Sequence, residues 1–401
     1  MRTKALSKRR GAVLVLAAAM MVVIFAFLAF TLDVGYIALT RTQLQAAADA
    51  AALGAGLELI DGLGLLPERS ASEVDSLARQ AAEELAAMHS AGELSSVYLN
   101  PERDVLLGRY EWDEQTGEWT AFWGVAPYNL VRVTLHRDQV YPGQEDGQPV
   151  VGDEELRLFF APALGHRTAA IRVRAAAALL PGVGFRVNPG SEQTVPVLPI
   201  ALDEPSWNAL LEGEGTDEYC YDCCCHCVCE GSDGVLEINI YPEAAPGNPR
   251  GNGNGTNQWT PGNRGTIDLG NPNNATPDLE RQILYGLNEE DLSYFGGELS
   301  FDDGPIEVNG DPGISAAIKD ELAAIIGEPR ALPLFSEVTG QGNNTYYKLV
   351  RFVGIRIMAV KLTGNNKYVI VQPATLVDET VVPGAISVSD ASLFTPVRLV
   401  E

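Results

Sequence analysis

An uncharged apolar run near the N-terminus constrains the fold of this chain more than any other feature. Residues 11–32 form a stretch of 22 residues without a charged side chain. About 20 such residues span the hydrocarbon core of a bilayer as a helix. Five basic residues and no acid precede the run, and Asp33 is the first acid of the chain. We therefore expect a transmembrane helix over 11–32, a cytoplasmic basic tail at 1–10 and export of the remaining chain.

A cleaved signal peptide is the main alternative to a retained anchor. Signal peptides have an apolar region of about 7–15 residues and small residues before the cleavage site. The run in this sequence is longer, and it ends in Phe30, Thr31 and Leu32. Its length and its end favour a single-pass anchor that is not removed.

The charge of the exported part limits what it can bind. The chain has 28 Lys and Arg against 53 Asp and Glu, a net charge of −25. Because five of the basic residues lie in the first 32, the exported part carries −30. Nucleic-acid binding requires a basic surface, so we expect none. The same excess argues against docking on anionic lipid, and it is typical of a soluble acidic exported surface.

The anchor is expected to continue as a long helix. Residues 33–59 contain no proline, and alanine, the best helix former, dominates the stretch after Gln45. Gly62, Gly64 and Pro67 then end the helical pattern. A second amphipathic helix is predicted over 70–89, where Ser70 and Glu73 form a capping-box pattern.

Alternating segments then predict a small antiparallel sheet. Strands are expected at 105–112 and 118–123, around a turn at 113–117, and again at 130–135 and 169–180. The Gly- and Pro-containing segment 181–193 is interpreted as a linker. The predicted fold class is α+β: a transmembrane helix that continues into a helix-and-sheet domain (33–180), followed by a second exported α+β domain (194–401).

The second domain is expected to mix strands, helices and one long loop. The segment 247–270 is rich in Gly, Asn and Pro and reads as the loop. The other elements are predicted from their apolar patterns, with strands at 194–202, 235–241, 347–353, 355–362 and 367–371 and helices at 278–287 and 314–326.

A cysteine cluster marks the second domain. All six cysteines lie within 220–229, and His226 lies among them. Three interpretations stay open: disulfides within the chain or between subunits, a soft-metal site, or a dispensable insertion. The candidate metal ligands are Cys223, Cys225, His226, Cys227 and Cys229.

Motifs of catalysis are missing from the sequence. It contains no GxSxG, no HExxH and no phosphate-binding loop with Gly-Lys-Ser/Thr. We therefore expect neither catalytic residues nor a cofactor, and a role other than that of an enzyme.

The N-terminal segment resembles the TadE/TadG-like proteins of the Flp (tight adherence) pilus machinery. The resemblance covers residues 8–58 and rests on Arg10-Gly11, Asp33-Val34-Gly35, Leu44-Gln45 and the run 48–53, Ala-Asp-Ala-Ala-Ala-Leu. The exported part is similar to that of TadG-related proteins at 198–203, Trp207, 270–274, 281–283 and 352–358.

This resemblance implies a pilin-like long helix and a structural or accessory role in pilus assembly, adhesion or secretion. The implied location is the bacterial inner membrane, and the implied partners are other pilus-machinery membrane proteins, contacted through the N-terminal helix, or further copies of the chain. The residues expected to serve packing and assembly are Asp33, Gly35, Leu44, Gln45, Ala48, Asp49, Ala51 and Leu53.

One position departs from the pattern of type IV-like pilins. Those proteins are cut after a glycine and carry Glu at the fifth position of the new chain. Here the candidate glycine is Gly11 and the fifth residue is Leu16. The departure argues that the anchor stays uncut.

Overall fold

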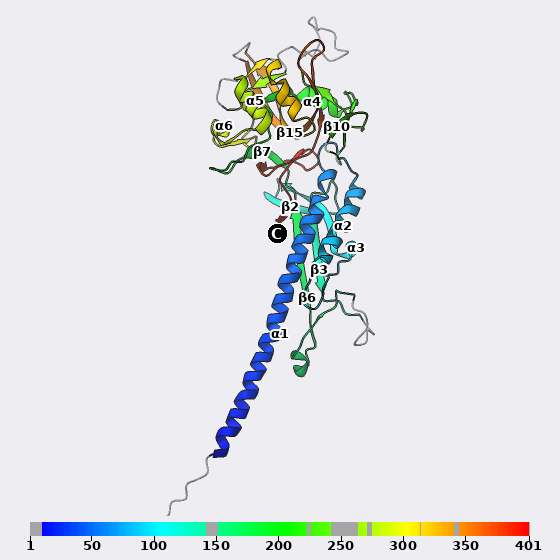
Figure 1. Ribbon diagram of the computed structural model, residues 1–401, viewed down its shortest axis with the longest axis vertical. Coiled ribbons are helices and arrows are strands. Elements are labelled where there is room, and N and C mark those ends of the chain that lie inside the picture. The colour runs from blue at the N-terminus through cyan, green and yellow to red at the C-terminus, as the bar shows by residue number, and fades with distance from the viewer. Residues whose placement is uncertain are drawn as a thin grey trace, which may run out of the picture.

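A long helix carries two folded domains, stacked one beyond the other, in the computed structural model (Figure 1). The structure describes residues 10–141, 151–222, 225, 227–241, 264–270, 275–312, 314–340 and 345–400. We call the helix-and-sheet domain beside the helix the proximal domain and the one beyond it the distal domain. Helices and strands are mixed in both, so the predicted α+β class is confirmed.

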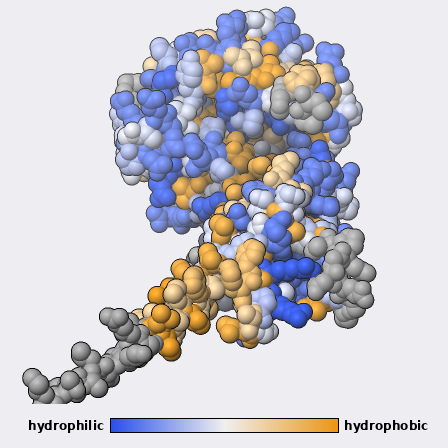
Figure 2. All heavy atoms as spheres, turned by 60° about the horizontal axis from the view of Figure 1, so that its bottom comes forward, coloured by the Kyte–Doolittle hydropathy of each residue, from blue (hydrophilic) through white to orange (hydrophobic). Residues whose placement is uncertain are grey.

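The helix α1 (Arg10–Leu57) is 48 residues long and unbroken. At a rise of about 1.5 Å per residue it is about 70 Å long. From Leu14 to Leu32 its large apolar side chains are exposed, whereas from Leu44 onward one face is buried. Figure 2 shows this exposed part as an apolar rod that projects from the folded domains, whose surface is largely hydrophilic. Among the described residues, α1 is the one helix long and apolar enough to cross a membrane.

The proximal sheet is antiparallel and has the strand order β2-β1-β3-β6-β21. The strands are β1 (Val105–Asp113), β2 (Glu118–Trp123), β3 (Leu130–Arg137), β6 (Ile171–Ala178) and β21 (Arg398–Val400). The predicted hairpin is confirmed, since Asp113 pairs with Glu118 across the turn. Short elements at the edges are η1 (Ile60–Gly62), α3 (Pro101–Asp104), β4 (Leu156–Arg157), η2 (Ala161–Leu164) and β5 (Thr168–Ala169).

Alanines form the contact between α1 and α2 (Ala71–Ala87). Ala48 and Ala51 of α1, like Ala78 and Ala82 of α2, are fully buried in one core with the apolar face of the sheet. Small side chains let two helix backbones approach closely, and the packing then depends on their size. The predicted cap of α2 is confirmed, since the Ser70 hydroxyl and the Glu73 carboxylate bond each other's backbone amides.

The distal domain is built on a sheet with the order β11-β17-β16-β14-β12-β8-β15. Because β15 also pairs with β16, part of this sheet closes into a ring. The strands are β8 (Ile200–Asp203), β11 (Ile238–Asn239), β12 (Arg264–Ile267), β14 (Ile306–Pro312), β15 (Pro329–Thr339), β16 (Thr345–Lys361) and β17 (Tyr368–Pro373).

Helices cover the distal sheet, and small sheets connect it to the proximal domain. The helices are α4 (Glu204–Leu211), α5 (Thr276–Tyr285), α6 (Glu289–Ser293), η3 (Ala316–Ile318) and α7 (Lys319–Ala324). The remaining strands are β7 (Gly182–Arg186), β9 (Tyr219–Asp222), β10 (Cys227–Glu230), β13 (Glu298–Ser300), β18 (Leu376–Val377), β19 (Val381–Pro383) and β20 (Leu393–Phe394).

The structure differs from the expected elements at several places. The segment 181–193 contains β7, whose Phe185 is fully buried, so a linker over its whole length was wrong. The two strands predicted at 347–353 and 355–362 are one strand, β16. The strand predicted at 235–241 is reduced to Ile238 and Asn239, which pair with β17, and a single bridge between Glu237 and Thr216. Most of the loop predicted at 247–270 lies outside the described residues.

The C-terminal end of the chain belongs to the proximal sheet. The predicted domain boundaries, which assigned all of 194–401 to the second domain, did not include this return. β21 pairs with β6, and Figure 1 places the C-terminus beside the proximal sheet. Further contacts join the domains, among them the Thr375 hydroxyl, which donates to the Leu63 carbonyl at 2.8 Å, and the Leu180 amide, which donates to the Thr395 hydroxyl at 3.0 Å.

We expect Ala48→Leu to overpack the contact between α1 and α2. Three additional carbon atoms in a filled core cost about 1–3 kcal/mol of stability. Ala46 is exposed on the same helix, so Ala46→Leu should change stability by less than about 0.5 kcal/mol. Thermal unfolding of the full chain in micelles, followed by circular dichroism, measures both variants. Equal unfolding temperatures would contradict the packing described here.

Candidate functional site

A single carboxylate ties α1 to the proximal domain where the apolar run ends. Asp33 is 3% exposed, although α1 around it is open to solvent. Its oxygens accept hydrogen bonds from the backbone amides of Phe159 at 2.9 Å, Phe160 at 3.0 Å and Ala161 at 2.6 Å. We call this arrangement the Asp33 clamp.

The clamp holds a short loop against the helix. Residues 158–165 lie between β4 and β5, which pair with each other, and they contain the one-turn helix η2. The ring of Phe159 packs on that of Tyr36, with centroids 5.0 Å apart. Gly165 ends the turn with φ +90°, a backbone conformation that glycine adopts readily.

Further polar contacts follow α1 away from the clamp. The Tyr36 hydroxyl donates to Glu93 at 2.8 Å, and Glu93 in turn pairs with the buried Arg137 at 2.5 Å. The Gln45 amide donates to the Arg174 carbonyl at 2.9 Å. These bonds fix the rotation of α1 about its own axis, and they therefore decide which face is covered and which is open.

The eight residues expected to serve assembly fall into three groups. Asp33 forms the clamp, and Gln45 bonds both Asp49 and the sheet. The apolar members of the set, Leu44, Ala48, Ala51 and Leu53, pack in the proximal core. Gly35 is exposed, and a Cβ built on it would meet no atom within 4 Å. Residues of the core are unavailable to a partner of the folded chain, whereas Gly35 is exposed and Gln45 and Asp49 are half-buried.

The open face of α1 was not foreseen as a unit. Gly35, Ala38, Leu39, Thr42 and Ala46 are all exposed. We call these residues the open face. A shallow depression beside it is lined by Arg41, Thr42, Gln45, Ala46 and Asp49. Spacings of three and four residues could have found the face, because such residues share one side of a helix.

The cysteine cluster folds as an exposed hairpin. β9 and β10 pair so that Cys220 lies opposite Cys229, and Cys225 and Cys227 are joined by a disulfide. The Sγ atoms of Cys220 and Cys229 are 2.7 Å apart, and this contact raises the pKa of the Cys220 thiol. The candidate ligands Cys223 and His226 lie outside the described residues. Among the described residues, no three His, Cys, Asp or Glu side chains are placed to hold a metal ion.

Buried polar groups hold the base of this hairpin. Glu237 is almost fully buried and accepts hydrogen bonds from the amides of Glu218 and Tyr219 at 2.9 and 2.8 Å. Burial raises the pKa of the Glu237 carboxyl although both bonds favour its charged form. The guanidinium of Arg356 lies 3.4 Å from the ring centre of Tyr221 and 3.7 Å from Glu68. The hairpin is thus attached both to the distal sheet and to the segment after α1.

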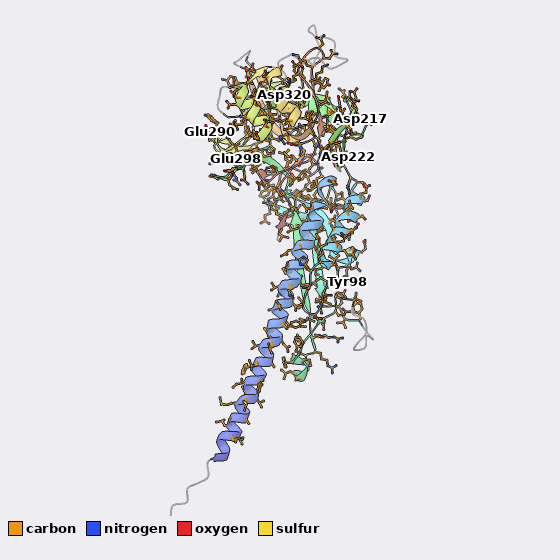
Figure 3. The ribbon with its side chains drawn as sticks, in the orientation of Figure 1. Tyr98, Asp217, Asp222, Glu290, Glu298 and Asp320 are labelled. Carbon is orange, nitrogen blue, oxygen red and sulfur yellow. A yellow bond between two sulfur atoms is a disulfide. The ribbon has the colours of Figure 1, made fainter. Side chains whose placement is uncertain are left out.

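Five acidic residues of the distal domain lie on different sides of it. Figure 3 places Asp217 and Asp222 on one side, Glu290 and Glu298 on another, and Asp320 apart from both. Asp217 accepts bonds from the Ser232 hydroxyl and from the amides of Asp233 and Gly234, so it organises a turn.

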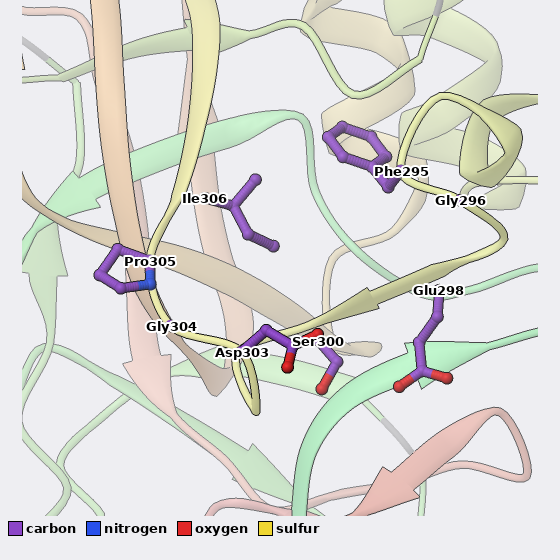
Figure 4. A pocket seen from close by; sticks show the side chains of 8 residues that line it. All are labelled: Phe295, Gly296, Glu298, Ser300, Asp303, Gly304, Pro305 and Ile306. Carbon is purple, nitrogen blue, oxygen red and sulfur yellow. The ribbon is translucent and has the colours of Figure 1, made fainter.

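One open depression in the distal domain carries no evident chemistry. Figure 4 shows its lining of Phe295, Gly296, Glu298, Ser300, Asp303, Gly304, Pro305 and Ile306. Glu298, one of the two carboxylates in this lining, pairs with Arg186 at the surface. The depression has no buried base or nucleophile, so we assign it no role.

We expect Asp33→Ala to release the loop at 158–165. The amides of Phe159, Phe160 and Ala161 would lose a charged acceptor, and each such bond is worth about 1.5–3 kcal/mol. Hydrogen exchange of these three amides, measured on the full chain in nanodiscs, should become faster. Asp49→Ala, which removes a carboxylate from the same helix, should leave them unchanged. Equal exchange in Asp33→Ala and the unaltered chain would disprove the clamp.

We also expect Cys220 and Cys229 to form a second cross-link. Residues directly opposite on antiparallel strands have Cα atoms about 4.5–5.5 Å apart, within the range of disulfides. Mass spectrometry of peptides from the purified chain, alkylated without reduction, should recover the Cys220–Cys229 linkage. Cys229→Ser should then leave Cys220 open to alkylation. Free, alkylated Cys220 in the unaltered chain would contradict the expectation.

Comparison with known proteins identifies the segment to which the clamp and the open face belong. No curated protein and no solved structure matches the chain. Residues 11–58 match the family model described as putative Flp pilus-assembly TadE/G-like, and these limits nearly coincide with those of α1. The N-terminal helix of this chain is therefore similar to the TadE/G-like Flp pilus-assembly segment over residues 11–58.

Proposed function

We propose that this chain is a membrane-anchored structural or accessory component of a Flp-type pilus assembly machine or a related secretion apparatus. It resides in the bacterial cytoplasmic membrane, with its basic N-terminus inside and both folded domains exported. It acts through contacts with other proteins and catalyses no reaction. The observation that supports this most is the match of residues 11–58, which covers α1 and little else.

The open face of α1 is the surface that the proposal assigns to partners. Glycine within a helix costs about 0.5–1 kcal/mol relative to alanine. The fold of this chain does not require Gly35 to be glycine, because a Cβ there would meet nothing. Small residues at a helix surface permit another helix to approach closely in a membrane. A partner helix that packs against α1 at Gly35 would explain why this position is a glycine.

The partners are other membrane proteins of the pilus machinery, or further copies of this chain. The clamp and the contacts of Gln45 keep the alanine face turned inward and leave the open face outward. A partner therefore meets α1 on the side away from the proximal sheet, where α1 emerges from the bilayer.

A second proposal uses the cysteine hairpin. In it the chain is a membrane-tethered binding or metal-handling protein, and the exposure of the hairpin supports this. Zinc that stays bound to the purified full chain in stoichiometric amount after dialysis would favour it. The pairing of Cys225 with Cys227, and the approach of Cys220 to Cys229, favour disulfides instead.

We expect Gly35→Leu to weaken partner binding without disturbing the fold. A bulky side chain on the open face should reduce recovery of pilus-machinery proteins about tenfold, equivalent to about 1.4 kcal/mol. Ser76→Leu places the same side chain on the exposed side of α2 and should leave recovery unchanged. Co-purification from membranes, read by mass spectrometry, measures both. The proposal fails if the unaltered chain recovers no pilus-machinery protein, or if both variants recover as much as it does.

A further inference from the structure

We propose that residues 158–165 form a second membrane contact, which inserts apolar side chains into the surface layer of the bilayer that α1 crosses. We call this segment the interfacial loop. The partner is the lipid surface itself, and the inference does not depend on the role in pilus assembly.

The side chains of the interfacial loop are those of a membrane-inserting segment. Phe159, Phe160 and Leu164 are 66%, 47% and 78% exposed. Three large apolar side chains exposed within six residues are unusual for a soluble surface, where exposed apolar residues are mostly scattered. Aromatic residues are enriched at the level of lipid headgroups.

The loop is fixed at the height where the membrane must end. The Asp33 clamp binds its backbone to the residue that directly follows the apolar run. In Figure 1 the loop is the part of the proximal domain that extends furthest along α1 toward its N-terminus. A bilayer that covers residues 11–32 therefore meets the loop at its surface. Its apolar side chains continue the exposed apolar surface of α1.

Most backbone amides of the loop donate hydrogen bonds within the protein, as a segment in contact with lipid requires. Every unsatisfied amide in hydrocarbon costs several kcal/mol. The amides of residues 159–161 donate to Asp33, and Pro162 has no amide hydrogen. The amides of Leu158, Ala163, Gly165 and His166 donate to carbonyls within the segment 158–167. A loop in water would need few of these bonds.

The basic side chains beside the loop are compatible with anionic lipid headgroups, whereas the net negative charge of the exported part is not. Exposed Arg157 and Arg167 flank the loop, one on each side. The exported part as a whole carries −30, which opposes general docking on anionic lipid. The contact is therefore local and apolar, and it holds the acidic domains above the membrane rather than against it.

A tryptophan placed in the loop tests the insertion. Leu164→Trp in the full chain, reconstituted in phosphatidylethanolamine and phosphatidylglycerol vesicles with brominated acyl chains, should have its added emission quenched roughly by half, since interfacial side chains reach the acyl boundary. Tyr285→Trp is the matched control, because Tyr285 is 67% exposed and lies in the distal domain. Its added emission should not be quenched. The five native tryptophans give the same background in both.

The result that overturns the proposal is quenching of Leu164→Trp and of a second loop variant, Phe160→Trp, that is as weak as that of Tyr285→Trp. A loop that requires a protein partner would give this result, because the vesicles contain no other protein. Phe160→Trp keeps an aromatic ring in the loop and repeats the test if Leu164→Trp alters the turn. Quenching of Phe160→Trp alone would still support insertion, and absence of quenching in both loop variants would refute it.

Discussion

The hydrogen bonds that Asp33 accepts are the interaction on which the rest of the architecture depends. The chain needs a charged residue to end its apolar run, yet a carboxylate beside a bilayer is costly unless it is paired. Three backbone amides 126 to 128 residues later satisfy it. The same bonds attach the proximal domain to the helix at the end of the apolar run, and together with the core packing of α1 they set the position of both folded domains relative to the membrane.

The helix α1 serves as anchor and core at once because its composition changes along its length. Large apolar residues face outward as far as Leu32, and small ones face inward from Ala47 onward. No break separates the two parts. A partner that moves or rotates α1 would therefore move the proximal sheet with it, and through β21 the end of the distal chain as well.

Local patterns predicted much of the fold, and long-range contacts escaped them. The long helix, the capping box of Ser70 and Glu73, and the hairpin at 113–117 are set by neighbouring residues, and all three are confirmed. The pairing of β21 with β6 joins segments more than 200 residues apart, for which one sequence offers no periodic signal. The linker was misjudged because glycines at 182 and 184 also suit a strand whose backbone is closely approached by its neighbours.

The candidate site shows the same division. The sequence marked Asp33 as a candidate residue. Its partners are backbone amides, which every residue type except proline carries, so the sequence could not identify them. The alanines were recognised as a packing surface, but whether they meet the chain's own sheet or another protein depends on the tertiary fold. Outward-facing Gly35 and the exposed phenylalanines of the interfacial loop have meaning only once burial is known, since either residue type is common inside proteins.

The depth profile of α1 in a bilayer tests the central claim most directly. A fluorophore placed in turn at Leu28, Leu32 and Leu39 of the full chain in vesicles reports lipid or water through quenching by brominated acyl chains or by aqueous iodide. The account predicts lipid exposure at Leu28, a boundary between Leu32 and Leu39, and access of iodide at Leu39. Lipid exposure at Leu39, or access of iodide at Leu28, would separate Asp33 from the membrane surface and contradict the account.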